Sequence, residues 1–125
     1  MSALTDLVWW LKSQAAVTAL VSTRITPMPL PQGSTLPAIT YWLISTPREY
    51  VQTGRAGLAR ARVQIDVWAS TYLEAQTVAE AVVTAFDGWH DTLGNVAFVE
   101  GPRDGYETDT KLYRKLLDVT IHYEE

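Results

Sequence analysis

The alternation of apolar and polar side chains over residues 60–67 constrains the fold most. Successive side chains of a β-strand point to opposite faces of a sheet, so this pattern predicts a strand, about 58–69, with one face in the core. The strand runs to Trp68, on its polar side. The apolar side carries Ala61, Val63, Ile65 and Val67, and the polar side carries Arg60, Arg62, Gln64 and Asp66. Such a mixed-charge face suits a nucleic-acid surface, a catalytic face or an edge where copies of the protein meet.

A helix is predicted directly after this strand, because the hydrophobic period changes from two to 3.6 at Thr71. Thr71 and Glu74 have the spacing of a capping box, in which each side chain satisfies a free backbone donor of the other residue. The helix should end near Gly88. Its apolar stripe consists of Ala75, Val78, Ala79, Val82, Ala85 and Phe86.

The N-terminal segment is apolar enough to resemble a signal peptide, but its details favour a globular helix. It has no basic region at its start, and Asp6 and Lys12 interrupt its apolar runs. No run approaches the roughly 20 residues that span a membrane. We expect one long amphipathic helix, or a helix and a following turn, ending near Ser22. The residues at helical spacing are Leu4, Leu7, Val8 and Leu11.

The remaining segments predict strands joined by loops. β-branched and aromatic residues favour strands at 23–26, 38–46, 95–100 and 111–125, with 38–46 buried on both faces. Residues 27–37 carry four of the six prolines and suit an extended crossover, whereas 47–57 and 101–110 are expected to be long polar loops, mobile in the free protein. The order predicts an α+β fold, a mostly antiparallel β-sheet with an N-terminal helix and a central helix packed on one face. We expect one domain, 1–125.

Composition excludes several classes of function. The net charge of −4 and the pI near 5.1 argue against general nucleic-acid binding, which needs a basic footprint. Hydrophobic content of 47% argues against disorder. The chain contains no cysteine, so disulfides, thiolate metal sites and a thiol nucleophile are not available.

The two histidines do not form a convincing catalytic or metal site. His90 lies between Asp87 and Asp91, and a carboxylate could orient its ring. A second nitrogen ligand is missing at any useful spacing, so exposure in a loop is the expected state. His122 falls on the last predicted strand, where packing or exposure is the default.

Three carboxylates, Asp104, Glu107 and Asp109, cluster in a glycine-containing loop, but their spacing is not that of an EF-hand. The chain also lacks G-x-S-x-G, phosphate-binding glycine patterns and H-E-x-x-H. We therefore expect no catalytic residue, no bound metal and no cofactor. An enzyme would be favoured only by an apolar pocket that converges on His90 with a carboxylate nearby.

Tryptophan is unusually abundant, with five residues. Large amphipathic rings are enriched at interfaces, although core packing is expected for three of the five. Trp9 and Trp10 are adjacent, so one helix face cannot bury both against one core. At least one of Trp9, Trp10 and Trp68 should meet another chain or cover a helix end.

Several segments, taken in order, resemble one family. The N-terminal helix leads into Arg24-Ile25 and "PQGSTLPAITY", then come "ARVQIDVWASTYLEAQTVAEAV" and a late "ETDTKLYRKLLDVTIHY". This arrangement is similar to the tail completion (tail-to-head joining, or tail terminator) proteins of siphophages and related prophages. The resemblance implies a structural virion protein, assembled in the host cytoplasm, that forms a homomeric ring, often hexameric, at the head-proximal end of the tail. Its partners would be other copies, the tail-tube protein and the head-connector or stopper protein.

The resemblance gives the polar face and the two polar loops a role as interfaces. In a ring, DNA would pass through the lumen without specific binding, and no membrane or cofactor is implied. The strand face, or the one carrying Arg114, Asp118 and Thr120, is expected near a subunit boundary or the lumen. The predicted interface residues are Arg48, Glu49, Tyr50, Arg55, Arg60, Arg62, Asp66, Trp68, Arg103, Asp104, Tyr106 and Glu107. The alternative is a small monomeric or dimeric binding module encoded in a mobile element.

Overall fold

The computed structural model describes residues 3–45, 48–51, 54–87, 89 and 96–124, and for residues 3–4, 45, 48–51, 54–60, 96 and 122–124 it describes only the backbone. The helices are α1 (Ala3–Ser13), α2 (Ala15–Val21) and α3 (Tyr72–Phe86). The strands are β1 (Ile25–Pro27), β2 (Ala38–Ser45), β3 (Arg48–Val51), β4 (Gly54–Ala69), β5 (Val96–Glu107) and β6 (Leu112–Glu124). This confirms the predicted α+β class, whereas the second N-terminal helix and strand β3 were not predicted.

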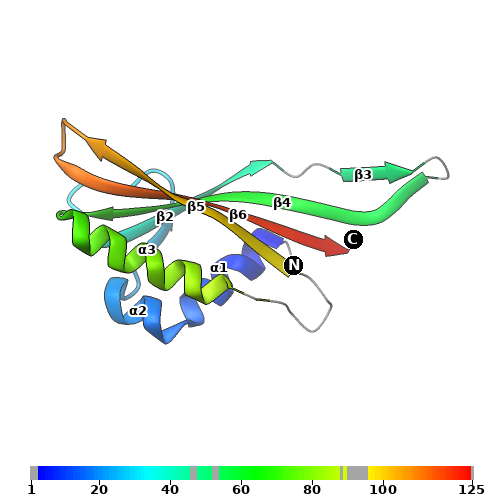
Figure 1. Cartoon of the computed structure of the whole chain (residues 1–125), viewed down its shortest axis with the longest axis horizontal. Coiled ribbons are helices and arrows are strands. Elements are labelled where there is room, and N and C mark those ends of the chain that lie inside the picture. The colour runs from blue at the N-terminus through cyan, green and yellow to red at the C-terminus, as the bar shows by residue number, and fades with distance from the viewer. Residues whose placement is uncertain (1–2, 46–47, 52–53, 88, 90–95, 125) are drawn as a thin grey trace.

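The strands form one long twisted sheet in the order β1-β2-β4-β6-β5, with β3 pairing to the far part of β4 (Figure 1). β1 runs parallel to β2, as the predicted proline-rich crossover between them requires, and the other pairs are antiparallel. The pairing of β4 with β6 extends from Leu58–Glu124 to Ala69–Tyr113. These two strands therefore form the centre of the sheet.

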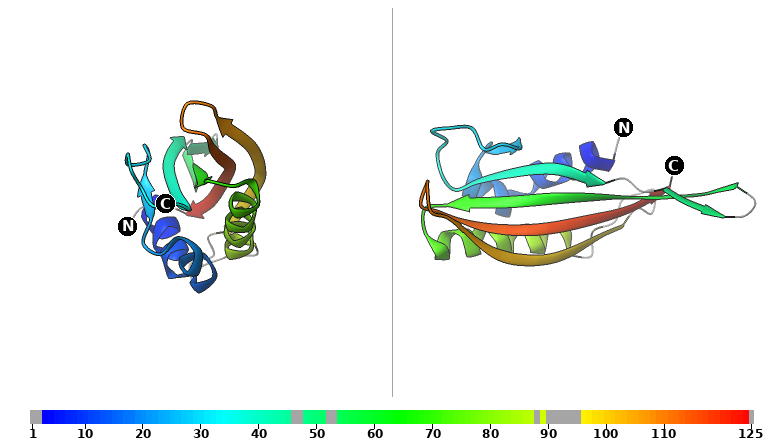
Figure 2. Two further views of the ribbon diagram at one scale, coloured as in Figure 1. Left: turned by 90° about the vertical axis from the view of Figure 1, so that its left-hand side faces the viewer. Right: turned by 90° about the horizontal axis from the view of Figure 1, so that it is seen from above.

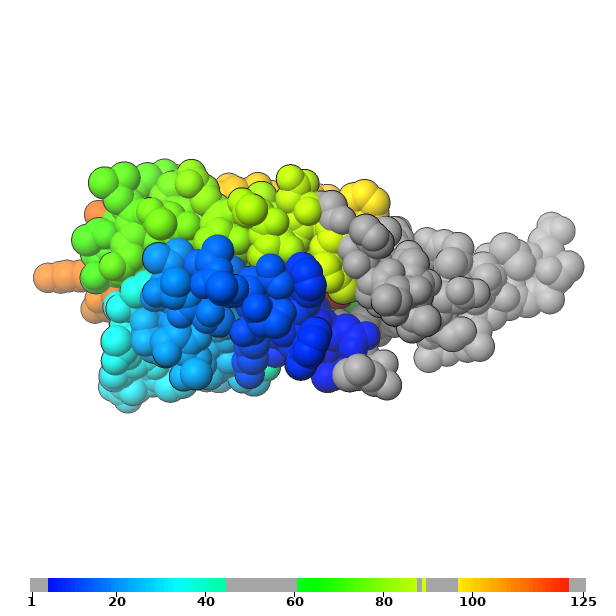
Figure 3. Space-filling view, turned by 90° about the horizontal axis from the view of Figure 1, so that it is seen from below, coloured from blue at the N-terminus to red at the C-terminus, as the bar shows by residue number. Residues whose placement is uncertain are grey.

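All three helices lie against one face of this sheet (Figure 2), and Figure 3 shows this face with the helices packed on it. The predicted apolar side of β4 is fully confirmed, because Ala61, Val63, Ile65 and Val67 are at most 1% exposed. They share the core with Leu117, Val119 and Ile121 of β6 and with the predicted stripe of α3. Complete burial of one such side chain contributes roughly 1.5–3 kcal/mol.

Helix α3 begins where the sequence predicts it. The Thr71 side chain accepts a hydrogen bond from the backbone N–H of Glu74, at 3.2 Å. The capping box is only half formed, because Oε1 of Glu74 is buried without a hydrogen-bond partner among the described residues. The helix ends at Phe86, close to the predicted Gly88.

The N-terminal region forms two helices instead of one long helix. The break lies at Gln14, whose extended backbone (φ −84°, ψ 113°) precedes α2. α2 ends at Val21, as predicted. The break lets both helices bury apolar residues, and Trp10 also donates a hydrogen bond from Nε1 to the Ala85 carbonyl of α3, at 2.8 Å.

Strand β2 is not buried on both faces along its whole length, contrary to the prediction. Ala38, Ile39 and Thr40 are buried, but Trp42, Leu43 and Ile44 are 48%, 41% and 43% exposed. The second half of β2 has no β1 residue beside it, because β1 pairs only with Ile39, Thr40 and Tyr41.

Neither polar loop exists as predicted. The 47–57 segment contains β3 and the start of β4, which pair into a hairpin, while residues 46–47 and 52–53 lie outside the described residues. The 101–110 segment continues β5 as far as Glu107, after a shift in register between Glu100 and Arg103. Gly101 makes this bulge possible: its φ is 102°, and a Cβ there would lie 2.9 Å from the Leu116 carbonyl oxygen.

Candidate interaction face

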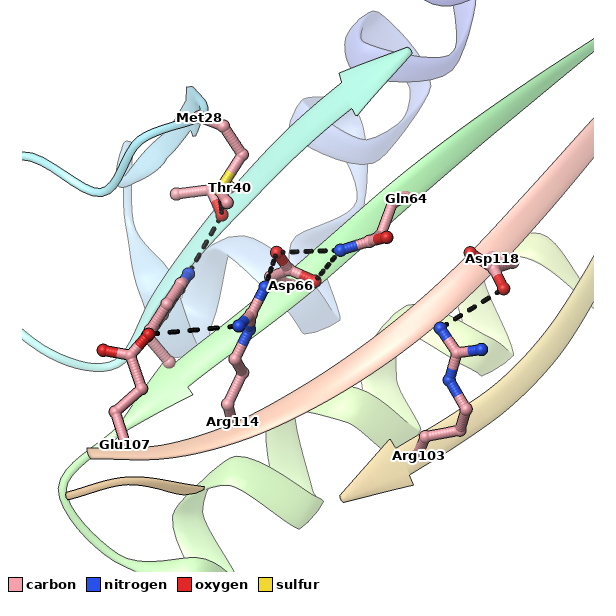
Figure 4. A network of polar contacts seen from close by, with 9 residues as sticks. Met28, Thr40, Gln64, Asp66, Arg103, Glu107, Arg114 and Asp118 are labelled. Carbon is pink, nitrogen blue, oxygen red and sulfur yellow. Dashed lines mark hydrogen bonds and ion pairs between the residues drawn. The ribbon is translucent and has the colours of Figure 1, made fainter. Parts of the chain in front are cut away.

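The sheet face opposite the helices, here called the outer face, carries a network of charged side chains that includes Asp66 and Arg103 of the predicted interface residues (Figure 4). Alternation places Gln64 and Asp66 on this face, because their neighbours in sequence belong to the core. The strand register then assigns the other members, since directly paired residues of adjacent strands share a face. Its members on β2, β4, β6 and β5 are Thr40, Trp42, Arg62, Gln64, Asp66, Trp68, Arg114, Leu116, Asp118, Thr120, Phe98, Glu100 and Arg103.

The centre of the outer face is a buried carboxylate, Asp66, which is 0% exposed. Its Oδ2 lies 2.8 Å from Nη2 of Arg114, and Gln64 donates to both carboxylate oxygens at 2.9 and 3.2 Å. A buried charge is tolerated only when it is paired and hydrogen-bonded, as Asp66 is here. Arg114 also lies 3.9 Å from Glu107, so it joins β4 to the end of β5.

Trp68 is buried on the polar side of β4, at 5% exposure. Its Nε1 donates to Oγ1 of Thr40 at 2.9 Å, and that hydroxyl in turn contacts Sδ of Met28 at 3.0 Å. The guanidinium of Arg114 lies 4.7 Å from the centre of the Trp68 ring. These contacts fix the crossover segment after β1 onto the outer face, through β2 and β4.

A second carboxylate, Asp118, holds two arginines. Its Oδ2 lies 3.1 Å from Nη2 of Arg62 and 3.4 Å from Nη2 of Arg103. The side chain of Asp118 is 6% exposed, whereas Arg62 and Arg103 are 49% and 58% exposed. Because the arginines remain in water, each pair contributes little stability, and their outer edges are available to a partner.

A third cluster lies at the end of β5 and the start of β6, beside the start of α3. Lys115 donates hydrogen bonds to Asp104 and to the hydroxyl of Tyr72, and its side chain is 4% exposed. Burial opposes the charge of Lys115, but its hydrogen bonds to Asp104 and Tyr72 outweigh burial, so the pKa of the amine is raised. The hydrogen bond from Lys115 lowers the pKa of Asp104.

A groove of about 580 Å³ opens at the same end of the sheet. The crossover segment 28–36 forms one wall, the β5–β6 turn forms the other, and Trp68 contributes to the lining. Glu107 is the one charged residue among its described lining residues. His90 lies outside the described residues, so the structure does not test a pocket around it. Among the described residues, no group of three or more His, Asp or Glu side chains could hold a metal ion.

The structure brings five of the predicted interface residues together on or beside the outer face: Arg62, Asp66, Trp68, Arg103 and Glu107. Asp66 and Trp68 are buried within the chain, so they support that face from below and offer little surface of their own. Asp104 and Tyr106 lie near the end of β5, with Tyr106 50% exposed.

The other five predicted interface residues fall where only the backbone is described. Arg48, Glu49 and Tyr50 belong to β3, and Arg55 and Arg60 to β4. Their side chains, like that of His122, lie outside the described residues. The interface role of all twelve residues stays a prediction.

Three features of the site were not predicted from the sequence. These are Lys115 beside Asp104, the Thr40–Met28 contact under Trp68, and the exposure of Trp42 and Phe98 at opposite edges of the sheet. The alternation in β6, aligned with that of β4, is the signal that could have paired Arg114 with Asp66. It requires the register of β4 against β6, which the sequence does not show.

The fold and the outer face are typical of an assembly subunit, because paired charges and exposed aromatic rings cover the surface that the helices leave open. None of the helices formed by the described residues is long and apolar enough to cross a membrane. The family model described as Tail completion protein gp17 matches residues 5–124. The chain therefore belongs to the Tail completion protein gp17 family and is a structural tail protein of a phage-like virion.

A solved virion structure contains the same fold. One chain of the structure titled "Virion of native gene transfer agent (GTA) particle" superposes with a TM-score of 0.76, over 100% of both chains and at 18% sequence identity. At this identity the likeness concerns the fold alone. No curated protein matches the chain.

Proposed function

We propose that this chain closes the head-proximal end of a phage-type tail tube as a homomeric, hexameric ring and joins the tail to the head connector. The family supports a role in completing the tail. The observation that carries the finer proposal is the outer face, a long surface of mixed charge that the helices leave open along the sheet (Figure 2). A ring needs one surface for neighbouring copies and one for its lumen.

The charge of the outer face suits a lumen that DNA passes through. Arg62, Arg103 and Arg114 are each paired with a carboxylate of the same face, so their charges are largely neutralised. With a net charge of −4 for the whole chain, a phosphate backbone would find no continuous basic track. The ring would therefore let DNA slide past without specific binding.

The two ends of the subunit suit two different partners. The β3–β4 hairpin projects beyond Leu58, the first β4 residue that pairs with β6, and the β5–β6 turn forms the opposite end (Figure 1). We assign one end to the tail-tube protein and the other to the head-connector or stopper protein. Tyr106, which is 50% exposed, gives the turn end an aromatic surface, and the neighbouring Asp104 and Glu107 are paired with Lys115 and Arg114.

Loss of the protein from its own particles tests this proposal. Electron microscopy of lysates that lack the chain should show filled heads and tails that are not joined, or tails of uncontrolled length. Restoring the intact chain should restore complete particles. A variant without residues 49–55 should remain folded by circular dichroism but should not restore head attachment. Complete particles in the absence of the chain, together with a monomeric purified protein, would favour the small binding module instead.

A further inference from the structure

The sheet has two edges that no strand of the described part of the chain covers. β5 pairs only with β6, and the second half of β2, from Trp42 to Ser45, has no β1 residue beside it. An edge strand presents unpaired N–H and C=O groups, and proteins usually protect it with charges, prolines or bulges. On β5, the N–H of Ala97 already donates to the Trp89 carbonyl at 3.4 Å, and the bulge follows Glu100. The stretch Phe98–Glu100 is therefore the part of this edge that no backbone group of the described residues covers.

The directions of the strands make the two edges complementary. β2 is antiparallel to β4, β4 to β6, and β6 to β5, so β5 runs opposite to β2. A second copy placed beside β5 in the same orientation would therefore present its β2 edge antiparallel to β5. This contact joins two different surfaces of the same chain, which is the kind of interface that closes a ring.

The two open segments also lie level with each other along the strand direction, as the register across the sheet shows. The register runs from Trp42 through Gln64 and Asp118 to Glu100. Two residues along β4, it runs from Ser45 through Arg62 and Thr120 to Phe98. A neighbour that is related by rotation, without a shift along the strands, would thus bring the open part of β2 beside the open part of β5.

The side chains at these edges match in chemistry. Trp42 is 48% exposed and Phe98 is 58% exposed, and both belong to the outer face. Cross-strand aromatic pairs stabilise antiparallel strands, and diagonal neighbours are within reach of rings of this size.

We propose that β5 of one copy pairs antiparallel with Trp42–Ser45 of β2 in the next copy, and that Phe98 packs against Trp42 across this contact. The sheet would then continue from subunit to subunit around the ring. This inference rests on the proposed ring function, and it assigns the residues through which the copies meet.

Cysteine cross-linking tests the contact cleanly, because the natural chain contains no cysteine. The double variant Ser45→Cys with Glu100→Cys keeps both aromatic rings and places one thiol on each edge. With a short bismaleimide, the assembled protein should give a ladder of covalent oligomers up to the full ring. Lys12→Cys with Glu100→Cys is the matched control, since Lys12 is exposed on α1, on the helix side of the sheet, and this pair should give no ladder.

A second variant tests the aromatic pair itself. Phe98→Asp, once circular dichroism has shown the variant to be folded, should weaken self-association about tenfold or more, as loss of a central aromatic contact does. Trp9→Asp, at a ring that is 70% exposed on α1, should leave self-association unchanged. An assembled ring without a cross-linked ladder, or one insensitive to Phe98→Asp, would overturn the edge contact and leave the ring function standing. The absence of any ring, in purified protein and in purified particles alike, would overturn the ring function itself.

Discussion

Nη2 of Arg114 lies 2.8 Å from Oδ2 of Asp66, whose side chain is completely buried in the middle of the sheet. This pair joins β4 to β6 under the outer face, while Arg114 also covers the ring of Trp68. The outer face, which we assign to the lumen of the ring, is therefore stabilised by an ion pair within the chain and needs no partner to form.

Arg114→Met should destabilise the chain strongly, because it leaves the Asp66 carboxylate buried without its cation. Breaking a buried ion pair on one side costs about 3–5 kcal/mol. Arg103→Met is the matched control, since the Arg103 side chain is 58% exposed and its pair with Asp118 should contribute at most about 1 kcal/mol. Urea denaturation of both variants measures the difference. Equal losses would show that Asp66 does not depend on Arg114.

The Lys115–Asp104 pair should make stability depend on pH on the acid side. The hydrogen bond from Lys115 lowers the pKa of Asp104 below its ordinary value of 3.8. A lowered pKa contributes stability that is present above the unfolded-state value and is lost as the pH falls through the folded-state value. Asp104→Asn should therefore reduce the free energy of unfolding at pH 7, and its difference from the wild type should shrink below about pH 4.

Denaturation curves between pH 7 and pH 3 measure this dependence. Asp109→Asn, at an exposed position in the β5–β6 turn, is the control and should follow the wild type at every pH. A gap for Asp104→Asn that stays constant as the pH falls would contradict the assigned role of the pair.

The cap of α3 makes a smaller contribution. Thr71→Ala removes the oxygen that accepts the N–H of Glu74 and should cost about 1 kcal/mol of stability. Thr84→Ala, at an exposed site near the end of the same helix, should change stability by no more than about 0.5 kcal/mol. Thermal unfolding followed by circular dichroism separates the two. A Thr71→Ala protein as stable as Thr84→Ala would show that the cap is not needed.

The adjacent tryptophans of α1 should behave in opposite ways. Trp10→Ala removes a ring that packs on the core and donates to the Ala85 carbonyl, and should cost about 3–5 kcal/mol. Trp9→Ala should have almost no effect on stability, because Trp9 is 70% exposed. Comparison of the two midpoints in denaturant checks this. A large loss from Trp9→Ala would place that ring in contacts that the structure does not contain.

The core and the helices could be predicted from the sequence because their signals are local. The alternation around Ile65 and the change of period at Thr71 require no knowledge of distant residues, and both are confirmed. Three tryptophans are at least partly buried, namely Trp10, Trp68 and Trp89, as expected.

The strands through 101–107 and 48–57 could not be predicted, because their glycines and prolines favour loops in any local reading. The bulge accommodates the positive φ of Gly101, and β5 pairs with β6 again from Arg103 onward. The polar contacts depend on register in the same way. Lys115 meets Asp104 only because the β5–β6 turn aligns them, and the exposure of Trp42 follows from the short length of β1.

The position and number of copies in the particle test the central claim most directly. We expect electron cryomicroscopy of purified particles carrying a tagged chain to place six copies in one closed ring where the tube meets the head. Tag density at another site, an open or dispersed arrangement at the junction, or particles without the tagged chain would contradict the account.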